Sequence, residues 1–159
     1  MEEKIPHMED WWNQSHEFIV KHRFPKQLIE DALAKSRVQL RGKNSINSIK
    51  SNFLDGAEEF LRTVCHRGVP LVLFSAGIGN LIETFLQWKM GSVPENLHII
   101  SNMMIFDEEG ICSAFSQPLI HTFNKNASVV DQERPFFHSI RSRPYVLLLG
   151  DSLGDLHMD

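Results

Sequence analysis

Ser75, Ala76 and Gly77 could together hold a phosphate group, because they directly follow a continuous apolar run at residues 69–74. Such a run, bounded by turn signals, is typical of a strand buried on both faces, as in a parallel sheet. Glycine allows a tight turn here, backbone amides at the start of a helix point toward an anion, and the Ser75 hydroxyl adds a donor. An ordinary helix cap and turn would use the same residue types, so the pattern alone leaves both interpretations open.

Two carboxylates, Asp151 and Asp155, follow a second apolar run at residues 145–149. This run also predicts a buried strand, and ligands of open α/β sheets bind beyond the carboxyl ends of the strands. The two side chains could therefore hold a hard cation such as Mg2+, directly or through water. Lys125 lies between the two motifs in the chain and could meet a phosphate as a point charge.

Each of these features has a plainer structural interpretation, since a Gly-Asp-Ser sequence is usually only a turn and a lone loop lysine is usually solvated. Their order along the chain favours a phosphoryl-transfer site: an anion-binding turn, then a lysine, then paired carboxylates. A serine hydrolase fits less well, because Leu73 stands where the nucleophile elbow needs glycine. A helical zinc site is unsupported, because none of the eight histidines forms a His-x-x-x-His pair.

The composition is that of an ordinary globular protein. Its 159 residues suit one domain, with 42% apolar and 23% charged residues. The net charge of −4 argues against a broad nucleic-acid surface, and no apolar run approaches the roughly 20 residues of a membrane span. Cys65 and Cys112 lie in no metal or redox motif, which favours a reduced setting. We therefore expect a cytoplasmic protein with neither a nucleic-acid nor a membrane partner.

Hydrophobic periodicity predicts an α/β fold with a helical segment in front. In chain order the expected elements are an amphipathic helix at residues 5–22, a helix from Pro25, a polar loop or insertion from Gly42, a helix at 57–67, the strand at 69–74, a helix around 81–86, a strand at 97–100, a hairpin of residues 103–106 and 111–115, and the strand at 145–149. Trp11 and Trp12 share the apolar stripe of the first helix, and Trp11 is expected in the core.

The residues that could do chemistry carry a family resemblance. Ser75, Lys125, and Gly150 and Asp151 with Asp155 resemble the second, third and fourth motifs of the haloacid dehalogenase superfamily of phosphatases. Longer stretches resemble the cytosolic 5′-nucleotidase III family. These stretches are residues 8–12 with Ser15 and His16, residues 74–79, 100–102 and 119–125, and residues 148–152.

The resemblance implies a haloacid dehalogenase-like, Rossmannoid α/β core with a helical cap that closes over a nucleoside monophosphate. Residues 1–55 would form part of the cap, with a possible insertion at residues 42–54, and residues 56–159 would form part of the core. The roles that the resemblance implies are phosphate binding by Ser75, Ala76 and Gly77, charge neutralisation by Lys125, Mg2+ ligation by Asp151 with support from Asp155, and substrate contact by Ser15 and Trp12.

Trp12 bears on the choice of substrate. The corresponding cap position in the family is aromatic and stacks on the base. A tyrosine there resembles the pyrimidine nucleotidases, whereas tryptophan is similar to the members that act on 7-methylguanosine monophosphate. The physical direction agrees, because a methylated guanine is positively charged and tryptophan offers the best face for a cation. A tryptophan on an amphipathic stripe is, however, more often a core residue than a ligand platform.

The chain departs from the family in one motif that the chemistry needs. The superfamily uses an aspartate nucleophile in an Asp-x-Asp-x-Thr motif, and no Asp-x-Asp occurs in these 159 residues. We expect that the chain begins inside the cap and ends just beyond the fourth motif, as a monomer that is inactive alone. Three hypotheses stay open: an incomplete Mg2+-dependent 5′-nucleotidase, a non-catalytic chain that binds nucleotide or phosphate, and a superfamily phosphatase for another small phosphomonoester.

Overall fold

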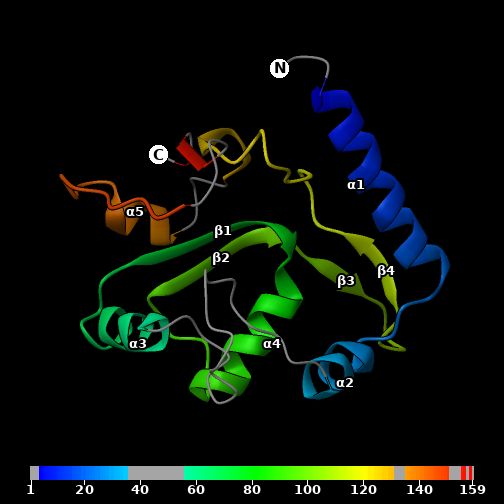
Figure 1. Cartoon of the computed structure of the whole chain (residues 1–159), viewed down its shortest axis with the longest axis horizontal. Helices are drawn as coiled ribbons and strands as arrows, with labels where there is room; N and C mark the ends of the chain where they lie inside the picture. The colour runs from blue at the N-terminus through cyan, green and yellow to red at the C-terminus, as the bar shows by residue number, and fades with distance from the viewer. Residues whose placement is uncertain (1–3, 36–55, 131–134, 151–154, 157, 159) are drawn as a thin grey trace, which may run out of the picture.

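The computed structural model describes residues 4–35, 56–130, 135–150, 155–156 and 158. Three helices come first in the chain, followed by a strand–helix–strand unit, a hairpin and two short helical segments (Figure 1). In chain order the elements are α1 (Lys4–Lys21), α2 (Gln27–Lys35), α3 (Ala57–His66), β1 (Leu71–Ile78), α4 (Gly79–Met90), β2 (Leu97–Asn102), β3 (Met104–Phe106), β4 (Cys112–Phe115), the 3-10 turn η1 (Ala127–Val129) and α5 (Pro135–Ile140). The possible insertion at residues 42–54 lies outside the described residues.

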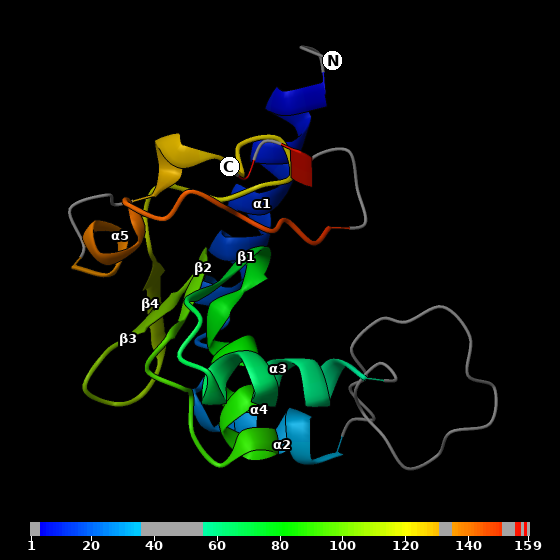
Figure 2. The same cartoon turned by 90° about the vertical axis from the view of Figure 1, so that its left-hand side faces the viewer.

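A parallel pair of strands forms the centre of the fold. β1 and β2 run side by side from the pair Leu71 and Leu97 onward. Parallel strands cannot be joined by a tight turn, and α4 supplies the crossover between them. Helices α3 and α4 lie on one side of the pair, and η1 and α5 lie on the other side (Figures 1 and 2). The carboxyl ends of both strands therefore open at the same edge of the sheet.

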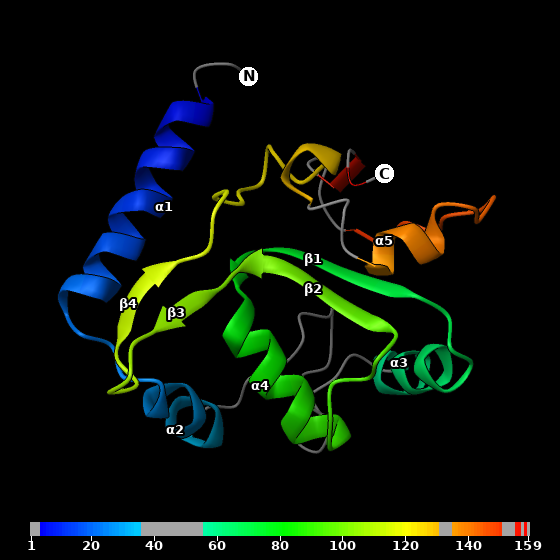
Figure 3. The same cartoon turned by 180° about the vertical axis from the view of Figure 1, so that it is seen from behind.

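The predicted hairpin is confirmed as the antiparallel pair β3 and β4. Its turn is closed by Asp107, whose Oδ1 accepts hydrogen bonds from the backbone N–H groups of Glu109 and Ile111 at 3.0 and 2.9 Å. Gly110 adopts a φ of 75°, a left-handed conformation that glycine tolerates. Helix α1 packs against β4 at the far side of the molecule from α3 (Figure 3).

One apolar cluster holds these elements together. Helix α2 packs against α4, and the helices contribute Ile29, Leu33, Leu61, Phe85 and Leu86. The strands complete the cluster with Leu97, Met104, Cys112 and Phe115. The amphipathic helix expected at residues 5–22 is confirmed as α1. In the described residues, no helix is both long and apolar enough to cross a membrane.

The predicted buried strand at residues 145–149 is wrong. This segment has no strand partner among the described residues, and its side chains are exposed, with Tyr145 89% and Leu147 79% accessible. A strand needs a neighbour with free backbone groups, and in this part of the chain the sheet that contains β1 has only β2 as its second strand. The apolar composition is that of a strand, but the partner that would bury it does not occur among these residues.

Candidate functional site

The residues predicted to bind phosphate lie in an irregularity at the end of β1. The register of the strand pair is regular up to Phe74 and shifts before Ile78, so that Ser75, Ala76 and Gly77 form a bulge. A bulge breaks the regular ladder and re-aims the backbone, which is common beside functional sites. The three residues are half-buried at the carboxyl end of the sheet, where the topology predicts a ligand site.

Two side chains from β2 take over the bonds that the ladder would have made. The hydroxyl of Ser101 donates to the carbonyl of Gly77 at 2.7 Å, and Nδ2 of Asn102 donates to the carbonyl of Ala76 at 2.8 Å. Inside the bulge the N–H of Gly77 donates to Oγ of Ser75 at 3.1 Å. The conformation of the turn is thus fixed by buried polar side chains.

Lys125 pairs directly with Asp155, and both side chains are largely buried, at 13% and 8% exposure. Gly150 packs against the same carboxylate, since a Cβ atom added there would lie 2.5 Å from Cβ of Asp155. The structure therefore brings together three of the residues that sequence order suggests. Asp151, the candidate metal ligand, lies outside the described residues.

The side chains around Lys125 indicate which groups could bind a divalent cation at this site. Asp155 is already paired with that lysine, which makes it a supporting group rather than an open metal ligand. The described residues contain no group of three or more histidine, cysteine, aspartate or glutamate side chains that could hold a metal ion. The described residues therefore form no complete cation site of their own, and Asp151 stays the ligand predicted from the sequence.

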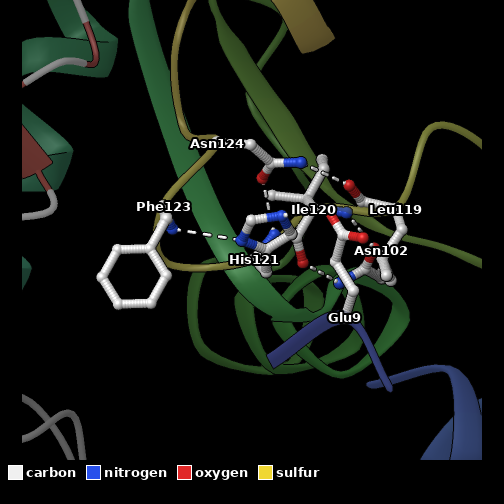
Figure 4. A network of polar contacts seen from close by, with 7 residues as sticks. All are labelled: Glu9, Asn102, Leu119, Ile120, His121, Phe123 and Asn124. Atoms are coloured by element: carbon white, nitrogen blue, oxygen red, sulfur yellow. Dashed lines mark hydrogen bonds and ion pairs between the residues drawn. The ribbon is translucent and has the colours of Figure 1, made fainter. Parts of the chain in front are cut away.

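The loop at residues 119–125 carries Lys125 and is tied by buried polar contacts (Figure 4). Asn102 bonds to both backbone groups of Ile120, as acceptor from its N–H and as donor to its carbonyl, each at 2.8 Å. Asn124 closes the loop on itself by accepting from the N–H of His121 and donating to the carbonyl of Leu119, both at 2.7 Å. The backbone leading to Lys125 is thus held at several points.

A polar contact between His121 and Glu9 joins this loop to α1. The N–H of Phe123 donates to Nδ1 of His121, which leaves Nε2 to face the carboxylate of Glu9 at 3.3 Å. Because Nδ1 acts as the acceptor, a neutral His121 carries its proton on Nε2 and donates it to Glu9. The helix with the predicted substrate residues therefore contacts the loop with the predicted phosphate residue.

The two predicted cap residues lie on α1. Trp12 is half-buried, with its ring centroid 5.5 Å from that of His16. The hydroxyl of Ser15 donates to the carbonyl of Trp11 at 2.7 Å, one turn back along the helix. The expectation that Trp11 belongs to the core is wrong, because its side chain is 58% exposed. It lines a shallow surface groove with Ser15 and Phe18.

Sequence reasoning assigned no role to Asn102, Glu9 or His121, although all three fall in the stretches of family resemblance. The only signal for Asn102 was its position at the end of an apolar strand, where a polar side chain is buried only if it is bonded. The pairing of Glu9 with His121 joins residues far apart in the chain and has no local pattern.

His16 of α1 is buried and stacks on Phe115, with ring centroids 3.7 Å apart. Its Nε2 atom has no hydrogen-bond partner among the described residues. Burial without compensating bonds disfavours the charged imidazolium, so desolvation lowers the pKa of His16.

Stability is expected to decrease as the pH falls below about 6.5, the usual pKa of histidine. The pKa of His16 is lower in the folded chain, so the unfolded state takes up the proton first. The contribution is complete above that pH and is lost as the pH falls toward the folded value. Thermal melts between about pH 5.5 and 7.5 should show a shallower dependence for His16→Phe. The exposed His7 gives the control, and an unchanged slope in His16→Phe would contradict the assignment.

Comparison with known proteins finds relatives along the whole chain. The family model described as pyrimidine 5′-nucleotidase (UMPH-1) matches residues 1–159. A Caenorhabditis elegans protein provisionally named cytosolic 5′-nucleotidase 3 is 54% identical over 159 residues, which are 100% of this chain and 39% of the relative. The 7-methylguanosine phosphate-specific 5′-nucleotidase of Rattus norvegicus is 37% identical over 99% of this chain and 48% of its own length.

A solved structure agrees with the fold. The crystal structure of cytosolic 5′-nucleotidase IIIB bound to cytidine matches with a TM-score of 0.77 and 29% identity, over 99% of this chain and 48% of that one. This match confirms the predicted α/β fold of the haloacid dehalogenase-like type. The chain spans about half the length of the relatives it matches, or less. From end to end, it belongs to the pyrimidine 5′-nucleotidase (UMPH-1) family.

Proposed function

We propose that the chain forms the phosphate-binding and base-binding parts of a cytoplasmic, monomeric, Mg2+-dependent 5′-nucleotidase. Its substrates would be 7-methylguanosine monophosphate, pyrimidine nucleoside monophosphates, or both, as the names of its relatives suggest. The observation that supports this best is the connection between the β1 bulge and the loop that carries Lys125, because Asn102 bonds to both. The domain division at residue 55 remains part of the proposal.

In this proposal the phosphate lies between the bulge and Lys125. Backbone amides and the hydroxyl of Ser75 would bind its oxygens, and the ammonium group of Lys125 would offset their charge. Asp155 would hold Lys125 in place, since the two side chains are already paired. Asp151 would ligate Mg2+, and the bound ion would supply further charge neutralisation at the phosphoryl oxygens.

The chain is expected to bind phosphate esters without hydrolysing them. The superfamily that the chain resembles transfers the phosphoryl group to an aspartate nucleophile in an Asp-x-Asp motif, and the chain contains no Asp-x-Asp sequence. This absence also favours the second candidate function, a non-catalytic chain that binds nucleotide. Phosphate release from a nucleoside monophosphate by the purified chain would contradict our assignment of the chemistry.

Trp12→Ala is expected to weaken binding of 7-methylguanosine monophosphate by about 5- to 30-fold, the loss of one cation–π contact of about 1–2 kcal/mol. Binding of inorganic phosphate should stay within about twofold, because the phosphate does not meet the ring. Isothermal titration of both ligands, with Mg2+ present, makes the comparison.

Trp88→Ala is the control, because Trp88 is an exposed tryptophan near the end of α4 and does not belong to α1. Its loss should leave the affinity for both ligands unchanged. Equal losses for nucleotide and phosphate in Trp12→Ala would contradict the stacking role and would favour a different phosphomonoester as ligand.

A further inference from the structure

Asn102 is the most completely buried polar residue of the site, with 0% of its surface exposed. Burying an amide without partners is costly, so its presence at the end of an apolar strand requires an explanation. Its bonds supply one. Both Nδ2 protons are used, one by the carbonyl of Ala76 and one by the carbonyl of Ile120, and Oδ1 accepts from the N–H of Ile120.

The side-chain amide of Asn102 bonds to the loop as a backbone peptide group of a neighbouring strand would. Its two bonds to Ile120 copy the donor and acceptor pattern that one strand offers to the next, and its third bond fixes Ala76 in the β1 bulge. Only asparagine presents a donor and an acceptor at this length, because aspartate lacks the donors and serine is too short. The bulge and the loop do not need to bond to one another, since the side chain joins them.

We infer that Asn102 is a positioning residue that sets the distance between the phosphate-binding turn at Ser75–Gly77 and the loop that carries Lys125. This inference rests on the proposed function, in which the two segments bind one phosphate from two sides. A shift of either segment would leave the amides or the ammonium group out of reach of the same oxygen atoms. In a preorganised site, even a small displacement of a binding group strongly weakens its interaction with the ligand.

Two other asparagines of the chain make similar bonds, and one of them, Asn96, lies away from the site. Asn96 donates to the carbonyls of Val69 and Val64 at 2.6 and 3.3 Å, at the opposite end of the sheet. The side chain of Asn80 accepts from the N–H of Met104 and donates to its carbonyl. If Asn102 mattered only for stability, substitutions at Asn102 and at the half-buried Asn96 would have the same kind of effect.

The test compares Asn102→Ser with Asn96→Ser by isothermal titration with inorganic phosphate and Mg2+, alongside thermal melts. Both variants should melt at lower temperature than the unsubstituted chain. Asn102→Ser should lose at least about tenfold in phosphate affinity, whereas Asn96→Ser should stay within about twofold. Equal phosphate affinity in the two variants would overturn the inference.

A second measurement needs no variant. In the isotope-labelled chain, the side-chain NH2 signals of Asn102 and the amide signal of Ile120 should shift on phosphate addition with the same dissociation constant as the amide of Ala76. A shift of Ala76 without any response at Asn102 and Ile120 would overturn the inference, as would no phosphate binding at all. Phosphate binding that is no weaker than nucleotide binding would contradict only the proposed function.

Discussion

Lys125→Met is expected to abolish phosphate binding and to lower the free energy of unfolding by about 3–5 kcal/mol, the usual cost of removing one partner of a buried ion pair. The pair with Asp155 is largely shielded from water, so Lys125→Met would remove the lysine partner of a buried carboxylate. Urea unfolding measures the stability, and isothermal titration with phosphate measures the binding.

The double variant Lys125→Met with Asp155→Asn separates the two effects. Removing both charges leaves no buried ion, so most of the lost stability should return, while phosphate binding should stay absent. The exposed pair of Arg23 and Glu109 supplies the control, and Glu109→Gln should change stability by less than about 1 kcal/mol. A double variant as unstable as Lys125→Met would show that packing rather than charge explains the loss.

Replacing Val146 and Leu147 with lysine is expected to change the chain from self-associating to monodisperse. Residues 145–149 read Tyr-Val-Leu-Leu-Leu, and they are exposed without a strand partner among the described residues. Short apolar segments with high strand propensity and no charge pair readily with other chains, and β1 offers an edge of the same kind. This association would be non-specific and is separate from the monomer that we propose for the functional protein.

Sedimentation velocity at several concentrations, together with binding of a hydrophobic dye, measures this change. Trp88→Lys is the control, because Trp88 is an exposed but isolated apolar residue on α4. Single exposed apolar residues are ordinary on protein surfaces, so this variant should associate as strongly as the unsubstituted chain. Association that persists in the Val146 and Leu147 variant would exclude this segment as its cause.

The elements that depend on local patterns were predictable from the sequence. Each of these elements has a recognisable sequence pattern within a few residues: the apolar stripe of α1, the apolar run of β1, the crossover helix α4 and the turn around Asp107. Residues 145–149 have an equally strong pattern, yet they form no strand. Burial of a strand depends on a partner elsewhere, which apolar composition alone does not reveal.

In the candidate site, too, some residues were predictable from the sequence and others were not. Sequence order suggested Ser75, Lys125 and Asp155, and the structure pairs the last two. The contacts that organise the loop could not be predicted, because Asn102 meets Ile120 and Glu9 meets His121 only after the chain has folded. Side chains that bond to distant backbone groups carry no periodic signal, so their roles became visible only in three dimensions.

The bond between the N–H of Gly77 and Oγ of Ser75 has a consequence for the kind of molecule that this turn accepts. A hydroxyl group can both give and take a hydrogen bond, but here one of its lone pairs is already engaged by the chain. The proton and the second lone pair of the Ser75 hydroxyl are not used by this bond, so half of its accepting capacity is already taken while its single donor is not. The bond therefore shifts the balance of this hydroxyl toward ligands that accept hydrogen bonds, independently of any charge on the ligand.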